Sequence, residues 1–299
     1  MDVLSIKNLK KSFADKEVLR GIDLSVPEHS VYGFIGKNGS GKTTTMKTVL
    51  GLLQPDAGEI FVLGERVSYG ETPTNRNIGY LPDVPEFYPF MTAREYLVYC
   101  GGIAGIGKSE SEARAKELLD LVGLANETHR IKGFSRGMKQ RLGIAQALLM
   151  RPKLLICDEP TSALDPLGRK EILDILSSLR EETTVLFSTH ILSDVERICT
   201  DVAFLNNGVI EVAGKLDDIK TKYRGTEYLI EAETAEDADL IAAEFGEAKR
   251  LDSQRITFCI STYPVSSVLR FLADNGVPVI KLERLEPSLE DLFLEVSEK

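Results

Sequence analysis

The sequence predicts an α/β domain with a mainly parallel sheet, followed by a smaller α+β domain. Over roughly the first two hundred of the 299 residues, strand-like segments alternate with helix-like segments. This alternation is typical of a parallel sheet covered by helices on both faces. The pattern restarts around Lys220–Thr226, so we place a domain boundary between 1–221 and 222–299. A chain of this length can bury one large core and one small one.

The period of the apolar residues places the elements of the first domain. Alternation with polar residues predicts a half-buried strand over 22–26, and short apolar runs predict further strands at Val31–Ile35, Leu154–Cys157 and Thr184–Ser188. Helices are predicted where apolar residues recur at i, i+3, i+4 and i+7, at 46–53, 115–122, 142–149 and 172–179. Pro152 should close the third of them. Asn207-Gly208 between two apolar runs predicts a hairpin.

The second domain has a pattern close to a ferredoxin-like βαββαβ arrangement. From Lys222 onward it contains 16 acidic and 9 basic residues, a net charge of −7 out of −10 for the whole chain. It contains no Gly-rich loop, metal cluster or catalytic constellation, so we expect it to act by contact or regulation. Its predicted strands are 228–231, 256–260 and 278–282, and its predicted helices are 235–245, 265–273 and 289–296.

The segment Gly36–Thr43 fits the pattern G-x-x-x-x-G-K-[ST] of a phosphate-binding loop, between an apolar strand and an amphipathic helix. Glycines allow backbone N–H groups to point at phosphate oxygens, and the helix N-terminus adds partial positive charge. We expect Lys42 to reach the β- and γ-phosphates and the Thr43 hydroxyl to bind Mg²⁺. The predicted nucleotide-binding residues of this segment are Gly36, Asn38, Gly39, Ser40, Gly41, Lys42, Thr43 and Thr44.

Two acids follow the apolar strand at 154–157. We expect Asp158 to bind Mg²⁺, as in other phosphate-loop ATPases, and Glu159 to polarise the attacking water. An Asp-Glu pair by itself is usually a solvated turn. Its place after a strand of the same sheet as the phosphate loop favours the catalytic interpretation.

Between these two motifs lies the segment 134–141, with the sequence FSRGMKQR. Here the chain resembles the ABC transporter ATPases, whose signature, most often LSGGQ, lies one helix before the acid-ending strand. Ser135 and Gly137 fit this signature, whereas Arg136 and Met138 replace the usual Gly and Gln, a variant that looks like those of drug and antibiotic exporters. The resemblance covers residues 3–215. It implies a P-loop NTPase fold with an N-terminal β-subdomain and a helical subdomain at about 84–150.

The resemblance implies roles for further residues. Phe13 matches the aromatic residue that stacks on adenine, although Phe13 by itself is equally a core residue. His190 matches the switch histidine on the γ-phosphate, which makes Glu159, His190 and Lys42 the predicted catalytic residues. Asp83 replaces the usual Gln of the family's Q-loop and completes the predicted metal ligands with Thr43 and Asp158. Because Asp is shorter than Gln, we expect Asp83 to reach Mg²⁺ through a water molecule.

The resemblance also implies partners and a location. Ser135 and Gly137 would act on ATP held by a second chain, so that a two-fold homodimer sandwiches two ATP molecules. Residues 84–100 lie where the family docks its integral membrane transport subunit, although core packing is an alternative for the aromatic residues among them, Phe87, Tyr88 and Phe90. We therefore expect a cytoplasmic ATPase, peripheral on the inner face of the cell membrane, that uses ATP and Mg²⁺ to power transport. The end of the chain, 289–295, resembles the extension of drug-export ATPases and favours export.

Composition narrows the alternatives. No stretch approaches the roughly 20 apolar residues of a membrane span, and the N-terminus lacks a signal-peptide block. A net charge of −10 is a poor match for nucleic acid. The four scattered cysteines form no CxxC pair, which argues against a zinc site. A chromosome-type ATPase would need a long heptad insertion, which the sequence lacks, and a pure binding module would not need Glu159 and His190. A soluble ABC-type ATPase not engaged in transport remains an alternative.

Overall fold

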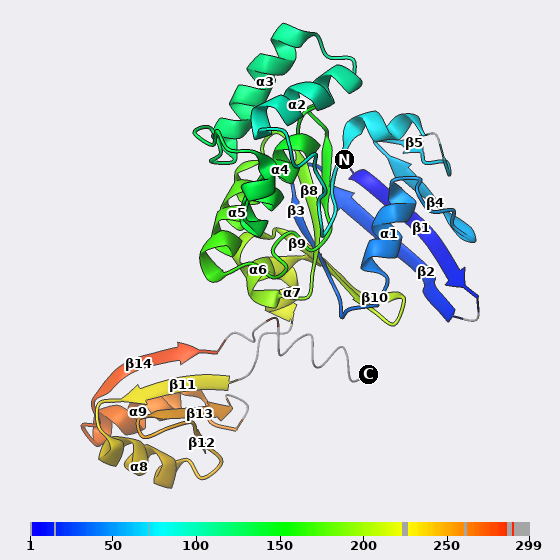
Figure 1. The fold of residues 1–299 in the computed structure, drawn as a ribbon. Coiled ribbons are helices and arrows are strands. Elements are labelled where there is room, and N and C mark those ends of the chain that lie inside the picture. Colours follow the sequence, from blue (N-terminus) through cyan, green and yellow to red (C-terminus); the bar gives the residue numbers. More distant parts are fainter. Residues whose placement is uncertain are drawn as a thin grey trace. The chain divides into compact units, whose positions relative to one another are not determined.

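The computed structural model describes residues 2–14, 16–70, 72–222, 227–259, 262–285 and Leu289. The chain forms two compact units, the first reaching Asp217 and the second beginning at Asp218. The first unit contains two sheets and most of the described helices, and the second contains a third sheet with helices of its own (Figure 1).

An antiparallel sheet forms the N-terminal part of the first unit. Its strands run in the order β2-β1-β4-β5. They span Asp2–Phe13 (β1), Lys16–Pro27 (β2), Ala57–Val62 (β4) and Glu65–Arg66 (β5). Ile22, Leu24 and Val26 are buried on one face of β2, as their alternation with polar residues predicts. This sheet is the expected β-subdomain.

The second sheet has the order β10-β9-β3-β8-β7-β6 and is parallel except for β10. Its strands span Val31–Ile35 (β3), Ile78–Leu81 (β6), Leu154–Cys157 (β7), Thr184–Thr189 (β8), Asp201–Asn206 (β9) and Val209–Lys215 (β10). Asn207 and Gly208 both have positive φ, at 46° and 80°, which is the conformation of a two-residue hairpin turn. The predicted parallel sheet and hairpin are therefore confirmed.

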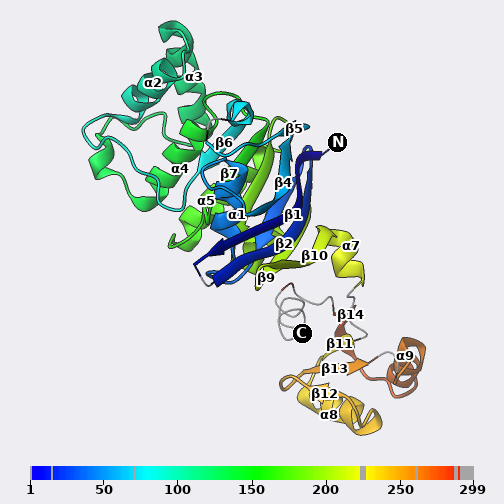
Figure 2. The ribbon, with the colours of Figure 1, turned by 90° about the vertical axis from the view of Figure 1, so that its right-hand side faces the viewer.

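Helix α1 (Lys42–Val49) lies between the two sheets, which Figures 1 and 2 show from two directions. Met46 and Val49 of α1 share one buried core with Ile6 of β1 and Phe34 of β3. On the opposite face of the parallel sheet, a Cβ at Gly33 would come within 3.1 Å of Val195 in α6 (Leu192–Ile198). Helix α5 (Pro166–Ser178) packs against α6. The parallel sheet is thus covered on both faces, as expected.

Three helices, α2 (Ala93–Ile103), α3 (Lys108–Leu121) and α4 (Arg136–Ala147), pack on one another beside the sheet (Figure 1). Thr92 and Glu95 cap α2 reciprocally: the Thr92 hydroxyl accepts from the Glu95 N–H, and the Glu95 carboxylate accepts from the Thr92 N–H. Short 3₁₀ turns lie at Pro73–Asn77 and Ile131–Gly133, and α7 spans Leu216–Lys222.

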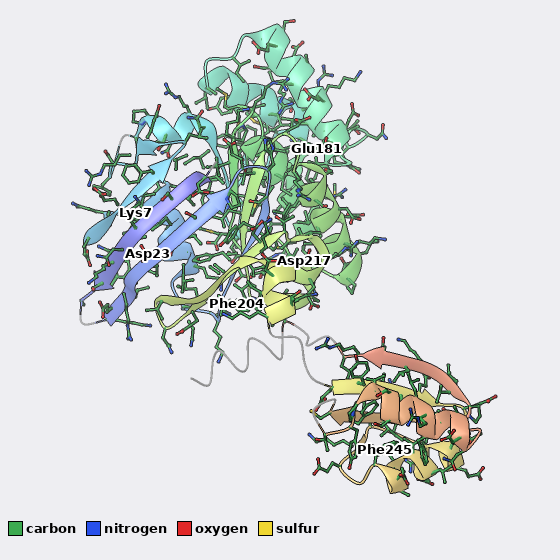
Figure 3. The ribbon with its side chains drawn as sticks, turned by 180° about the vertical axis from the view of Figure 1, so that it is seen from behind. Lys7, Asp23, Glu181, Phe204, Asp217 and Phe245 are labelled. Atoms are coloured by element: carbon green, nitrogen blue, oxygen red, sulfur yellow. The ribbon has the colours of Figure 1, made fainter. Side chains whose placement is uncertain are left out.

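The second unit has a ferredoxin-like fold. Its elements are β11 (Glu227–Ala232), α8 (Ala235–Glu244), β12 (Lys249–Arg250), β13 (Arg255–Cys259), α9 (Val265–Asp274) and β14 (Val279–Arg284). All three strand pairings in the order β12-β13-β11-β14 are antiparallel. Ile230, Phe258 and Phe245, the last labelled in Figure 3, belong to its separate core. The predicted ferredoxin-like arrangement is confirmed.

Some predicted boundaries are wrong. Helix α1 ends at Val49 rather than near Leu53, because Gly51 at φ 68° supplies the left-handed residue that commonly terminates a helix. Helix α4 ends at Ala147, before Pro152 is reached. The two-residue strand β12 is too short to give a period and was not predicted. Of the predicted helix 289–296, only Leu289, which is buried, belongs to the described residues.

Candidate nucleotide site

The chemistry-bearing residues gather at the carboxyl edge of four neighbouring parallel strands. The phosphate loop follows β3, His190 follows β8, Asp158 and Glu159 follow β7, and Asp83 follows β6. In parallel sheets, ligands bind at this edge. A cavity of about 510 Å³ lies there, lined by Phe13, Lys16, Val18, Asn38, Gly39, Gly41, Lys42, Thr43, Thr44, Asp83, Asp158, Glu159, Ser162 and His190. The structure therefore brings together most of the residues predicted from the sequence.

Two glycines of the phosphate loop cannot be replaced without strain. Gly41 has φ 114°, and a Cβ there would lie 2.6 Å from Leu19. A Cβ at Gly36 would lie 2.5 Å from Ser40 Oγ and 2.6 Å from the Leu205 carbonyl oxygen. Gly41 is also the N-cap of α1, with no side-chain cap and no acid in the first turn. The positive end of α1 therefore remains available to an anion.

Lys42 is held at the centre of the loop. Its Nζ donates to the Gly36 carbonyl oxygen at 2.6 Å and lies 3.1 Å from Glu159 Oε1. Only 6% of the side chain is exposed. A buried ammonium group needs compensating charge or hydrogen bonds, and Lys42 has both. Its position fits the predicted role on the β- and γ-phosphates.

Glu159 is oriented by its backbone and by two partners. It has φ 48°, an uncommon conformation for a non-glycine residue that often marks functional sites. Its N–H donates to Ser188 Oγ at 2.9 Å, and its Oε2 lies 3.0 Å from His190 Nδ1. Ser188 in turn donates to Asp158 Oδ1 at 2.7 Å. One hydroxyl on β8 therefore positions both acids.

Sequence reasoning missed Ser188, which lies in a strand whose residues are all buried. A polar residue in such a strand must find a partner, and that requirement was the available signal. Lys16 and Val18, which also line the cavity, were not predicted either.

The residues fit a magnesium ion. The hydroxyl of Thr43 and the carboxylates of Asp158 and Asp83 line the same cavity, and hard oxygen ligands are those that Mg²⁺ prefers. Asp158 is buried, with Ser188 contacting one of its oxygens.

Asp83 also contacts the signature helix. Its Oδ1 lies 3.3 Å from Arg136 Nη2, and its carbonyl oxygen accepts a hydrogen bond from Gln140 Nε2 at 2.7 Å. Partial burial raises the pKa of Asp83 above its ordinary value, with Arg136 opposing the shift and Asp158 adding to it. Two of the three departures from the usual family pattern, Asp83 and Arg136, thus lie in contact.

Ser135 and Gly137 do not line the nucleotide cavity of their own chain. They line a separate cavity of about 300 Å³, together with Leu164 and Asp165. Ser135 is the N-cap of α4, accepting from the Met138 N–H at 3.2 Å. Within one chain, these two predicted nucleotide-binding residues therefore belong to a different surface from the phosphate loop.

Comparison with known proteins agrees with this geometry. Residues 19–162 match the family described as ABC transporter. The chain is 39% identical over 297 residues to the uncharacterized ABC transporter ATP-binding protein YxlF of Bacillus subtilis (strain 168), covering 98% of this chain and 99% of that protein. This chain belongs to the ABC transporter ATP-binding proteins.

Two other known proteins are similar to this ABC protein over most of its length. It is 35% identical over 312 residues to the bacitracin transport ATP-binding protein BcrA of Bacillus licheniformis, which covers 98% of this chain and 97% of that protein. A solved structure of an ATP-binding subunit of an ABC transporter superposes with a TM-score of 0.64 at 34% identity, covering 74% of this chain and 93% of the other. Residues 214–297 match the C-terminal domain of DrrA1-3-like ATP-binding proteins.

Family membership settles the general activity of this ABC protein. It binds ATP and is an ATPase of the ABC type, with the P-loop fold that the sequence predicts. No helix among the described residues is long and apolar enough to cross a membrane.

Proposed function

We propose that this protein is the motor subunit of an exporter and that it works with a separate integral membrane subunit. The proposal rests on the cavity at the carboxyl edge of β3, β8, β7 and β6. This cavity holds the residues of an ATPase site, and one of them, Asp83, also contacts Arg136 of helix α4, which carries the signature sequence. The similarity to a bacitracin transport protein and the DrrA1-3-like C-terminal match support export. We place the protein in the cytoplasm, on the inner face of the cell membrane.

In this proposal Glu159 accepts a proton from the attacking water, and His190 holds the Glu159 carboxylate in place while contacting the γ-phosphate. Lys42 neutralises charge that develops on the transferred group. Thr43 and Asp158 would hold Mg²⁺, and Asp83 would do so through water. When bound, the ion supplies electrostatic stabilisation of the phosphates. Phe13, whose ring is 47% exposed at the rim of the cavity, stacks on adenine.

The nucleotide site is completed by a second copy of the chain. Ser135 and Gly137 line a cavity separate from the nucleotide cavity of their own chain, so both can contact ATP that is bound to a partner chain. The N-terminus of α4 then presents donors to the γ-phosphate from the opposite side. We propose a homodimer with two ATP molecules at its interface, in which hydrolysis opens the dimer.

The proposed docking surface for the membrane subunit consists of 84–100 and the groove beside it. The groove, of about 410 Å³, is lined by apolar residues together with the cations Lys132, Arg136 and Lys139 and the acids Asp83 and Glu86. Tyr88 and Phe90 are 46% and 60% exposed, whereas Phe87 is half-buried and packs edge-to-face on Tyr96 at 5.1 Å. Core packing therefore explains Phe87 but not the other two. Exposed apolar clusters of this kind mark binding surfaces.

Replacing Phe90 by aspartate should reduce co-purification with a membrane protein by about tenfold or more, because a buried interface aromatic typically contributes about 2 kcal/mol or more. ATP binding should persist, since Phe90 is not among the described residues that line the nucleotide cavity. The measurement is affinity purification of the full chain from detergent-solubilised membranes of its source cells, followed by quantification of bound integral membrane protein. Leu52→Asp is a matched control, because Leu52 is 62% exposed but outside 84–100.

Equal recovery with Phe90→Asp and the unaltered chain would refute the proposed docking surface. Complete absence of membrane protein from the unaltered chain, with ATPase activity intact, would favour a soluble ATPase that does not engage in transport.

Replacing Asp83 by alanine should weaken coupling to the membrane subunit more than it weakens basal hydrolysis. Basal turnover should change by less than about fivefold, because exposed ion pairs such as Asp83–Arg136 contribute only about 0.2–1 kcal/mol. The measurement compares ATP turnover of the chain alone with turnover in the reconstituted complex, and includes a Mg²⁺ titration. Loss of Mg²⁺ binding by the isolated Asp83→Ala chain would contradict the water-bridged role.

A further inference from the structure

Asp56, the residue before β4, binds the last residues of β1 through hydrogen bonds and an ion pair. Asp56 Oδ1 lies 2.7 Å from Lys11 Nζ, and its Oδ2 accepts the Ser12 N–H at 2.6 Å. The Asp56 N–H in turn donates to the Lys10 carbonyl oxygen at 2.9 Å. Asp56 therefore contacts three consecutive residues of β1 immediately before Phe13.

Lys11, which is bound by Asp56, also contacts the aromatic ring of Phe13. Its Nζ lies 5.4 Å from the centroid of the Phe13 ring, within the range of a cation–π contact. Only 13% of the Lys11 side chain is exposed, which is unusual for a surface lysine. The hydrogen bond from Lys11 holds the pKa of Asp56 below its ordinary value, as expected for a carboxylate that faces a donor.

The Lys11 contact leaves the nucleotide cavity clear. Among the described residues that line this cavity, Phe13 is present and Lys11 is not. Lys11 therefore contacts the ring without occupying the cavity in which a base would stack. A ring held in one orientation before binding loses less conformational freedom when a flat base stacks on it.

We propose that Lys11 and Asp56 are positioning residues that hold Phe13 for adenine. The inference rests on the proposed stacking role of Phe13. Asp56 fixes Lys11, Lys11 fixes the ring, and neither touches the nucleotide. The contribution is specific to the base, because the phosphates would be bound by the loop around Lys42, and neither Lys11 nor Asp56 is among the described residues that line the cavity there.

Lys11→Met retains the length of the side chain and removes its charge, and Asp56→Asn retains an oxygen for the Ser12 N–H. Each should raise KM for ATP by about two- to fivefold, the factor of an exposed cation–π contact, with kcat retained. Binding of inorganic tripolyphosphate, which has no base, should not change. Lys7→Met is the matched control: Lys7 lies on the same strand, 5.8 Å from the Phe61 ring centroid, and neither residue lines the cavity.

A spectroscopic readout is available because the chain contains no tryptophan. Phe13→Trp gives a single reporter at the ring position, whose fluorescence ATP should quench and tripolyphosphate should not. Adding Lys11→Met or Asp56→Asn to the Phe13→Trp chain should raise the ATP concentration that gives half-maximal quenching by about two- to fivefold. Adding Lys7→Met should leave it unchanged.

The outcomes separate this inference from the function on which it rests. If Phe13→Ala leaves the preference for ATP over tripolyphosphate unchanged, the stacking role of Phe13 is wrong. If Phe13→Ala lowers that preference while Lys11→Met and Asp56→Asn do not, stacking stands and the positioning role is overturned. Equal loss of ATP and tripolyphosphate binding in Lys11→Met would also overturn it, because that result indicates general damage to the site.

Discussion

Glu159→Gln should slow ATP turnover by about 10²–10⁴-fold, the usual contribution of a general base, while ATP remains bound. Glutamine keeps the shape of the side chain but cannot accept the proton from water. Lys42 keeps its hydrogen bond to the Gly36 carbonyl oxygen, and the loop glycines are unaltered, so the phosphates retain their ligands. Uncleaved ATP should then hold two chains together.

Sedimentation with and without Mg-ATP measures the trapped dimer, and phosphate release measures turnover. Glu181→Gln is a suitable control, because Glu181 lies in the turn between α5 and β8, labelled in Figure 3, and does not line the nucleotide cavity. Normal hydrolysis by Glu159→Gln would remove Glu159 from the catalytic role. Slow hydrolysis without a dimer would keep that role and count against the ATP sandwich.

Two inactive chains should restore activity to each other when mixed. Ser135→Asp keeps a good N-cap for α4 but places a carboxylate where a phosphate is expected, so its activity should fall by about 10²–10³-fold, as on losing a transition-state donor. Lys42→Met should abolish ATP binding in its own loop. In a mixed dimer, the intact loop of the Ser135→Asp chain faces the intact signature of the Lys42→Met chain.

Random mixing at equal concentrations should therefore recover about a quarter of the unaltered activity, since half of the dimers are mixed and each has one complete site. Phosphate release after subunit exchange is the measurement. The matched control mixes Lys42→Met with the double variant Lys42→Met, Ser135→Asp, in which no dimer has a complete site. No recovery in the first mixture, despite detectable mixed dimers, would show that Ser135 does not act across the dimer.

The amino-acid sequence is enough to predict the parts of this protein that depend on local pattern. The strand Leu154–Cys157, the phosphate loop after β3 and the Asn207-Gly208 hairpin were predictable, because residue period and turn chemistry act over a few positions. Alternating strands and helices also predicted the parallel sheet, and a parallel sheet places the carboxyl ends of its strands at one edge. That rule is sufficient to predict that Lys42 and Glu159 lie near each other.

Contacts between residues that are far apart along the chain could be identified only from the folded structure. Ser188 contacts both Asp158 and Glu159, Asp83 contacts Arg136, and Asp56 contacts Lys11. These pairs lie 29 to 53 residues apart, and none of them has a local signature. The separation of Ser135 from the nucleotide cavity of its own chain also cannot be predicted from the period of the apolar residues. Such contacts depend on strand register and on how helices pack against the sheet, and both are set by the whole core at once rather than by neighbouring residues.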